Sequence, residues 1–144
     1  MKNYSQQLRL DDWSGCGNSI AANAPISTHL ILESMRCWAL ELGVDGFRFD
    51  LGIALSRGDQ LKPLNEPPLF AAMEADPQLS DLKLVSEPWD CGGLYRLDDF
   101  PAKRIGTWNG HFRDGVRRFW KGDDHSTWSL AQRFKGSPDL YDGK

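Results

Sequence analysis

The first regular pattern of apolar and polar positions in the chain is helical. Pro25 suits the first position of a helix because its φ is fixed near the helical value, and Gly43 suits a C-terminal cap. Between them, apolar residues recur at i, i+4, i+7 and i+11, the spacing of one helical face. These residues are Ile31, Met35, Trp38 and Leu42. The pattern predicts a helix over 25–42 with Met35 and Trp38 in the core.

Two short stretches after this helix have the pattern of β-strands. In residues 44–50, Phe47 and Phe49 alternate with polar residues, which predicts a strand with the two rings on one face. Residues 83–86 (KLVS) predict a second strand, which ends at Glu87-Pro88 because proline cannot donate to a strand ladder. The chain before residue 25 is dense in turn-forming residues and is expected to be irregular.

The remaining segments complete an alternation of helices and strands. We expect a loop over 56–68, a helix over 69–75, a loop over 90–104, a helix over 111–121 and a weaker helix over 127–134. This order is typical of βαβ units and predicts an α/β fold with a parallel sheet. Two strands do not form a stable sheet alone, and a (β/α)₈ barrel needs about 250 residues. The 144 residues therefore indicate an arc of a larger structure.

A carboxylate stands at the end of each predicted strand. Asp50 and Glu87 lie 37 positions apart (50 to 87), which suits one crossover between neighbouring parallel strands. Such strands lie about 4.8 Å apart, so the two carboxyl groups can reach the separation of about 5–5.5 Å found in retaining glycosidases. Arg48 shares the face of Asp50 and is expected to keep it ionised and oriented, as a nucleophile requires.

Glu87 is the matching candidate for the general acid/base. It follows an apolar strand and precedes Trp89, surroundings that suit a carboxyl group holding a proton for a leaving oxygen. Each motif also has an alternative interpretation: residues 47–50 (FRFD) as a strand ending in a surface salt bridge, and residues 86–89 (SEPW) as a strand end beside a buried tryptophan. The pattern by itself leaves several classes of α/β enzyme open.

Composition narrows the function classes. A net charge of −3 with scattered basic residues gives no reason to expect a nucleic-acid partner. Three widely spaced cysteines favour a reducing compartment, and the three histidines lack metal-ligand spacing. We see neither a secretory signal nor the roughly 18 continuous apolar residues of a membrane span. Six tryptophans suit either core packing or stacking on sugar rings.

Several motifs together resemble a known enzyme family. Residues 43–50 (GVDGFRFD) and 85–90 (VSEPWD) resemble the second and third conserved regions of the alpha-amylase superfamily. Four further segments resemble isoamylases and bacterial glycogen debranching enzymes more specifically. They are residues 14–18 (SGCGN), 87–95 (EPWDCGGLY), 108–123 (WNGHFRDGVRRFWKGD) and 136–141 (GSPDLY). The resemblance implies that Asp50 is the nucleophile, Arg48 its partner and Glu87 the acid/base.

The resemblance also implies a fold and an activity. The fold is part of a (β/α)₈ TIM barrel, roughly the strand 4 and strand 5 units with their helices and loops. The activity is hydrolysis of α-1,6-glucosidic branch linkages in glycogen or amylopectin, with retention at the anomeric carbon. No organic cofactor is implied, and nothing in the sequence has the dense oxygen-ligand spacing of the structural calcium that some members bind. A cytoplasmic protein is expected, or a plastid-stroma protein in a eukaryote.

The sequence lacks parts of the family pattern that the family's activity needs. The first and fourth conserved regions, the N-terminal β-domain and the C-terminal β-sandwich are expected outside residues 1–144, and the third catalytic carboxylate with them. We therefore interpret residues 1–144 as a fragment of one catalytic barrel domain, inactive alone and dependent on the rest of the barrel for stability. Two smaller departures are Gly52 and Ser86, where the family usually has alanine.

Further residues are candidates for substrate binding. Trp89 and Trp108 lie in loops past strand ends and are interpreted as sugar platforms, with loop packing as the alternative. Asn109 and His111 open a predicted helix, where helix capping competes with substrate binding. Residues 14–18 suggest the rim of the active site or a tight turn.

Two other functions remain as alternatives. A related glucan-branching or glucan-transferring enzyme uses the same two carboxylates, and a non-catalytic remnant would bind glucan without cleaving it.

Overall fold

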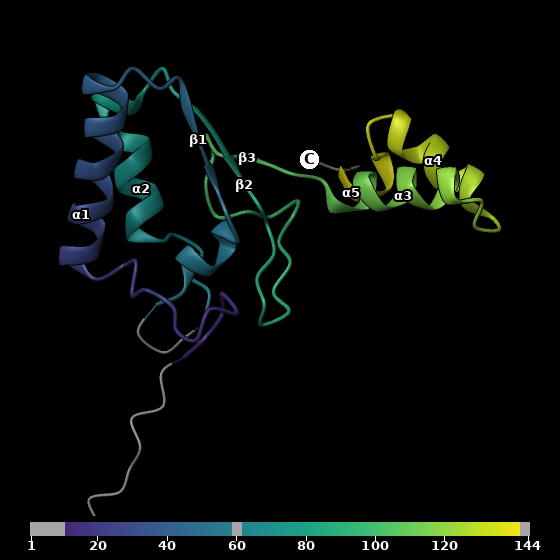
Figure 1. Cartoon of the computed structure of the whole chain (residues 1–144), viewed down its shortest axis with the longest axis horizontal. Helices are drawn as coiled ribbons and strands as arrows, with labels where there is room; N and C mark the ends of the chain where they lie inside the picture. The colour runs from purple at the N-terminus through teal and green to yellow at the C-terminus, as the bar shows by residue number, and fades with distance from the viewer. Residues whose placement is uncertain (1–10, 59–61, 142–144) are drawn as a thin grey trace, which may run out of the picture. The chain divides into compact units, whose positions relative to one another are not determined.

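The computed structural model describes residues 11–58 and 62–141, and it divides the chain into two compact units. The first is Met1–Thr107 and the second is Trp108–Lys144. Figure 1 shows the elements of both units. The first contains both predicted strands and the candidate carboxylates, and the second is helical.

A parallel three-stranded sheet organises the first unit. Its strands are β1 (Gly46–Phe49), β2 (Lys83–Ser86) and β3 (Gly106–Thr107), in that spatial order. The predicted parallel pairing of the first two strands is confirmed, with Gly46 beside Lys83 and Phe49 beside Ser86. β3 was not predicted, because two residues are too few to show a period of two.

The helices of the first unit are α1 (Pro25–Arg36) and α2 (Pro68–Ala75), with the π-helical turn η1 (Cys37–Glu41) and the 3₁₀ turns η2 (Gly52–Ser56) and η3 (Pro77–Leu79). α1 and η1 together match the predicted first helix, and Gly43 has a φ of 72° after it, as a glycine cap requires. Proline begins both α-helices.

One face of the sheet packs against α1 and α2, which lie together on one side of the three strands (Figure 1). The buried cluster comprises Ala22, Met35, Leu69, Phe70, Met73, Leu79, Leu84 and Ile105. Phe47 and Phe49 pack against this cluster, as their alternation predicted. Arg48, between them, therefore points to the opposite face, where the candidate chemistry lies.

The prediction that Trp38 belongs to the core is wrong for this chain. Met35 is 5% exposed, but Trp38 is 51% exposed and Leu42 is 59% exposed. Met35 faces the cluster formed with α2, whereas Trp38 follows it on η1 and lines an open groove beside α1 with Leu30 and Met35. Within the described residues, no element covers that side of the helix.

A loop after η2 closes on itself at its base. The main-chain N–H of Leu64 donates to the carbonyl of Ser56 (2.9 Å), and Arg57 forms an antiparallel bridge with Pro63. The loop predicted over 56–68 is therefore pinned where it leaves η2 and where it approaches α2.

The second unit consists of α3 (Gly110–Lys121), α4 (Ser126–Phe134) and the short α5 (Pro138–Tyr141). The two longer helices were predicted, and α5 was not. Gly115 lets α3 and α4 approach, since a Cβ there would lie 3.1 Å from Cγ of Arg133. Gly122 ends α3 with a φ of 86°. Trp120 and Trp128 are largely exposed on these helices.

Candidate active site

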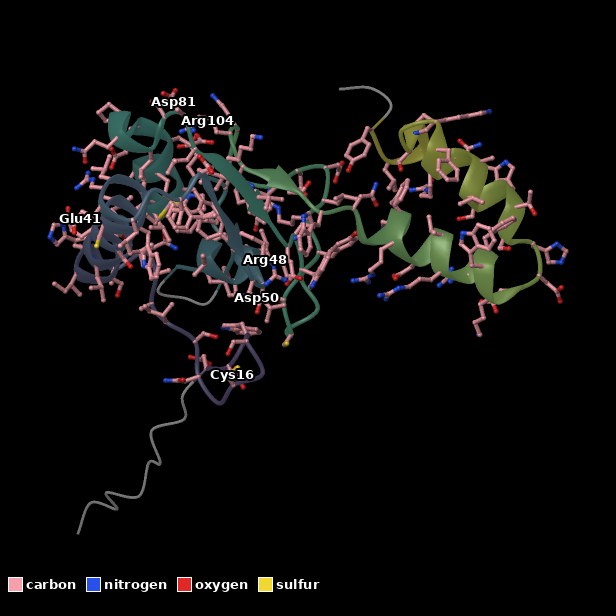
Figure 2. All side chains as sticks on the ribbon, turned by 45° about the horizontal axis from the view of Figure 1, so that its top comes forward. Cys16, Glu41, Arg48, Asp50, Asp81 and Arg104 are labelled. Carbon is pink, nitrogen blue, oxygen red and sulfur yellow. The ribbon has the colours of Figure 1, made fainter. Side chains whose placement is uncertain are left out.

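The end of β1 brings an arginine beside the first candidate carboxylate. Nη2 of Arg48 lies 3.1 Å from Oδ1 of Asp50, which is 75% exposed at the side chain. The two residues lie side by side where the strand ends (Figure 2). The expected pairing of Arg48 with Asp50 is therefore present in the structure.

Glu87 takes the corresponding place at the end of β2. Its main-chain N–H donates to the carbonyl of Phe49 (3.1 Å), and its carbonyl accepts from the N–H of Ile53 (3.2 Å). Its side chain is 10% exposed, so the two carboxylates have different surroundings. Two main-chain hydrogen bonds therefore hold Glu87, the candidate acid/base, against the segment that contains Asp50.

The side chain of Glu87 has a partner at each oxygen. Oε1 forms an ion pair with Nη2 of Arg48, and Oε2 accepts from the N–H of Leu51 at 2.9 Å. Leu51 has a φ of 44° and a ψ of 40°, a left-handed conformation that is uncommon for a residue with a Cβ. Such strain clusters at functional sites, and here it accompanies an amide bonded to the carboxylate.

Arg48 joins the two carboxylates through a single nitrogen. Oδ1 of Asp50 and Oε1 of Glu87 both lie within hydrogen-bond range of Nη2, so the two oxygens are no more than about 6 Å apart. This range includes the separation of about 5–5.5 Å typical of retaining glycosidases. Sequence reasoning assigned Arg48 to Asp50 alone, because the register that sets Arg48 opposite Val85 is not visible in the sequence.

The two small departures from the family pattern meet in space. A Cβ added to Gly52 would overlap Oγ of Ser86 and lie 2.9 Å from Cβ of Phe49. Ser86 is 1% exposed, and its hydroxyl donates to the carbonyl of Glu87 (3.1 Å). The Ser86 hydroxyl therefore fits only because position 52 has no Cβ.

A hollow of about 350 Å³ lies beside Asp50. Its lining comprises Ser14, Cys16, Asn18, Ser19, Ile20, Asp50, Leu51, Ala54 and Leu55. The loop 14–18, for which both a site rim and a tight turn were considered, is a tight turn that lines this hollow. Polar groups and an apolar wall in one hollow suit a sugar, which has both kinds of surface.

Asp12 holds the turn that forms this wall. Its carboxylate accepts main-chain N–H groups from Ser14 (3.0 Å), Gly15 (2.8 Å) and Gly17 (2.9 Å). The Gly17 amide is the main cause of the lowered pKa of Asp12, and the bonds to Ser14 and Gly15 lower it further. The carboxylate form of Asp12 therefore favours the observed turn.

A buried ion pair ties the loop after β2 to the end of η2, and a tryptophan of the N-terminal segment packs against it. Nη2 and Nε of Arg57 lie 2.6 and 3.0 Å from Oδ2 of Asp90, whose side chain is fully buried. The guanidinium carbon also lies 3.8 Å from the ring centroid of Trp13. Sequence reasoning missed this cluster because its members come from three separate segments.

The loop after β2 also positions the aromatic candidate Trp89. Its ring lies 5.9 Å from that of Tyr95, and the two residues form an antiparallel bridge. This arrangement supports the loop-packing interpretation of Trp89, and its role as a sugar platform stays a prediction.

Trp108, Asn109 and His111 belong to the second unit. Asn109 is the N-cap of α3, where its Oδ1 accepts from the N–H of Phe112 (2.9 Å) and its Nδ2 donates to Oγ of Ser137 (3.1 Å). Trp108 and His111 are exposed. The capping role considered for Asn109 is therefore observed, and substrate contacts of the three residues stay a prediction.

The described residues hold no group of three or more His, Cys, Asp or Glu side chains that is arranged to bind a metal ion. The three cysteines, Cys16, Cys37 and Cys91, are free and exposed. None of the helices in the described part of the chain is both long enough and apolar enough to cross a membrane.

Comparisons with known proteins give relatives along most of the chain. It is 46% identical over 142 residues to isoamylase 3, chloroplastic, of Oryza sativa, covering 98% of the chain and 18% of the relative. It is 45% identical over 129 residues to a glycogen debranching enzyme of Serratia proteamaculans, covering 89% of the chain and 19% of the relative. The chain thus spans about a fifth of the length of these curated relatives.

The structure matches pullulanase type I from Bacillus subtilis, crystallised with maltose, with a TM-score of 0.67 and 25% identity. That match covers 90% of the chain and 19% of the pullulanase. No family model matches the chain. The chain is homologous to a segment of isoamylases and glycogen debranching enzymes, and the resemblance inferred from its motifs is confirmed.

Proposed function

We propose that this chain is a segment of a retaining glycoside hydrolase of the alpha-amylase superfamily that cleaves α-1,6 branch linkages of glycogen or starch. The observation that carries the proposal is the single nitrogen of Arg48 within reach of both Asp50 and Glu87. Because one cation contacts both groups, the two carboxylates at neighbouring strand ends lie close enough together for a double displacement on a sugar, which needs a separation of about 5–5.5 Å. Relatives named isoamylase and glycogen debranching enzyme support the choice of linkage.

In the first step, a carboxylate oxygen of Asp50 attacks the anomeric carbon of the branch glucose. The bond between that carbon and the O6 oxygen of the glucan backbone breaks, and Glu87 gives its proton to this O6 oxygen. A covalent glycosyl ester on Asp50 results. For this step Glu87 turns a protonated oxygen from Arg48 toward the leaving group, while Arg48 keeps its contact with Asp50.

In the second step, water attacks the same carbon. Glu87, now ionised, takes a proton from the water, and the ester bond to Asp50 breaks. The released branch has a free reducing end with the original anomeric configuration, and both carboxyl groups return to their starting states. Asp50 is exposed and Glu87 is largely buried, so the two carboxyl groups lie in different surroundings, in keeping with two different roles.

We infer that the remainder of a (β/α)₈ barrel surrounds the chain, with β1 and β2 as barrel strands 4 and 5. In the described sheet, β1 and β3 each have one unpaired edge, and Leu30 of α1, Trp38 of η1 and Leu42 directly after η1 are exposed. Exposed edges and apolar faces of this kind normally pack against further elements. The chain alone should therefore lack activity, since the third carboxylate is expected from outside it.

The proposal also covers partner and place. The substrate is a branched α-glucan such as glycogen or amylopectin, and it binds in the hollow beside Asp50. The protein acts in the cytoplasm, or in the plastid stroma in a plant cell, in line with the chloroplastic label of the rice relative.

The test inserts residues 1–144 into rice isoamylase 3 in place of its own matching segment. The resulting protein is called the segment swap. We expect the segment swap to release linear chains from amylopectin and the free chain to release none. Asp50→Asn and Glu87→Gln should each lower turnover by about a thousandfold. Asp45→Asn, a change of an exposed carboxylate just before β1, is the matched control and should leave turnover unchanged.

A substrate with an activated leaving group separates the two roles. α-Maltosyl fluoride needs no proton to lose fluoride, so Glu87→Gln should keep its first step while Asp50→Asn loses it. Near-normal turnover of amylopectin in either variant would refute the assignment. New α-1,6 linkages among the products would indicate a branching enzyme, and glycogen binding without reducing ends would indicate a binding remnant.

A further inference from the structure

Ser86 lies directly behind the candidate acid/base, on the buried face of the sheet. It is the last residue of β2 and is 1% exposed. Its hydroxyl donates to the carbonyl oxygen of Glu87 at 3.1 Å. A buried hydroxyl placed in this way restrains the main chain that carries the Glu87 side chain.

The same carbonyl of Glu87 accepts a second bond from the N–H of Ile53 at 3.2 Å. The N–H of Glu87 donates to the carbonyl of Phe49 at 3.1 Å. Three hydrogen bonds therefore hold the Glu87 main chain, and two of them come from the segment that contains Asp50. A change in any of them should move the two carboxylates relative to each other.

The hydroxyl of Ser86 occupies space that any other residue at position 52 would fill. A Cβ at that position would overlap Oγ of Ser86 and would lie 3.1 Å from Cβ of Ser86 and 2.9 Å from Cβ of Phe49. Buried contacts this short force the chain to shift. The glycine thus admits the hydroxyl to its place under Glu87.

We propose that Ser86 is a positioning residue for Glu87, and that its hydroxyl is the main reason why position 52 holds glycine, since the overlap with Oγ is the shortest contact that a Cβ there would make. The part that concerns catalysis rests on the proposed role of Glu87. The coupling between positions 52 and 86 is a matter of packing and holds whatever reaction the site performs.

The coupling is tested by four forms of the segment swap: unchanged, Gly52→Ala, Ser86→Ala and the double variant. Hydrogen exchange is read by mass spectrometry on peptides covering 47–56 and 83–90. Gly52→Ala should raise exchange about a hundredfold, as overpacking does. The double variant should recover to within about tenfold of the unchanged protein, because the contact with Phe49 remains. A double variant as loose as Gly52→Ala would overturn the coupling.

The positioning role has two readouts of its own. Ser86→Ala should raise exchange of the Glu87 and Ile53 amides about fivefold, the loss of one hydrogen bond. It should lower kcat by a similar factor at unchanged KM and move the limb of the pH profile that Glu87→Gln abolishes. The matched control is Ser56→Ala, because Ser56 is equally buried but donates to the carbonyl of Ile53 (2.7 Å).

Ser56→Ala should leave that pH limb in place. If Ser86→Ala leaves both the limb and the Glu87 exchange unchanged, Ser86 only fills space and the positioning role is wrong. A segment swap that folds but cleaves no glucan would overturn the proposed function instead, and the exchange measurements would still decide between coupling and independence of positions 52 and 86.

Discussion

Replacing Asp90 by asparagine is expected to loosen the loop that carries Trp89. The carboxylate of Asp90 is fully buried and accepts two bonds from Arg57 through one oxygen. Its other oxygen accepts the N–H groups of Gly92 (2.9 Å) and Leu94 (3.0 Å). Asparagine keeps one acceptor for the amides but removes the negative charge from beside Arg57.

The size of the effect follows from the burial of the pair. The Arg57 side chain is 11% exposed, so its charge is poorly hydrated once the carboxylate is gone. Breaking a buried ion pair by removing one partner costs about 3–5 kcal/mol. If the loop opens locally, this corresponds to amide exchange faster by a factor of about 150 to 5,000 over residues 88–96.

The assay is hydrogen exchange by mass spectrometry on the segment swap, read on a peptide covering 88–96. The control is Asp99→Asn, since Asp99 pairs with Arg96 at 2.8 Å but is 51% exposed at its side chain. An exposed pair contributes about 0–1 kcal/mol, so exchange should change less than about fivefold. Equal acceleration in the Asp90 and Asp99 variants would refute the reasoning from burial.

Three further predictions follow from single contacts. Gly46→Ala should prevent correct pairing of β1 with β2, measured as loss of soluble segment swap, because a Cβ at Gly46 would overlap the carbonyl of Lys83. The pKa of Asp12 is lowered below 3.8, so the stability that its carboxylate gives the turn is complete above about pH 4 and is lost as the pH falls through the lowered value. Hydrogen exchange of the turn amides, measured against pH with Asp12→Ala as the reference, tests this. Asn109→Ala should destabilise α3 by about 1 kcal/mol, whereas Asn109→Ser keeps a cap for Phe112; a raised KM in the serine variant would indicate a substrate contact beyond capping.

Local patterns carried much of the fold. β2 (Lys83–Ser86) has the predicted bounds because Pro88 limits it, and α2 differs from its predicted range by one residue. The side of the sheet on which Phe47 and Phe49 lie followed from their alternation. Each of these features depends on residues that are close in sequence.

Features that depend on distant contacts could not be predicted in the same way. The register of β1 against β2 makes Arg48 a partner of Glu87 as well as of Asp50, and no local pattern encodes a register. The exposure of Trp38 is a similar case, because periodicity shows which residues share a face but not what covers that face. The 3₁₀ turn after Asp50 is too short to have a period.

The hydrogen bond between Ser56 and Leu64, which closes the base of the loop after η2, has an evolutionary consequence. A loop closed in this way can gain or lose residues at its tip without transmitting strain to the strands, since lengthening a loop costs little once its ends are fixed. The part of the crossover between Ser56 and Leu64 can therefore vary in length among descendants while the reacting groups keep their spacing. Natural variation in length should accumulate there, and engineered insertions should be tolerated there first.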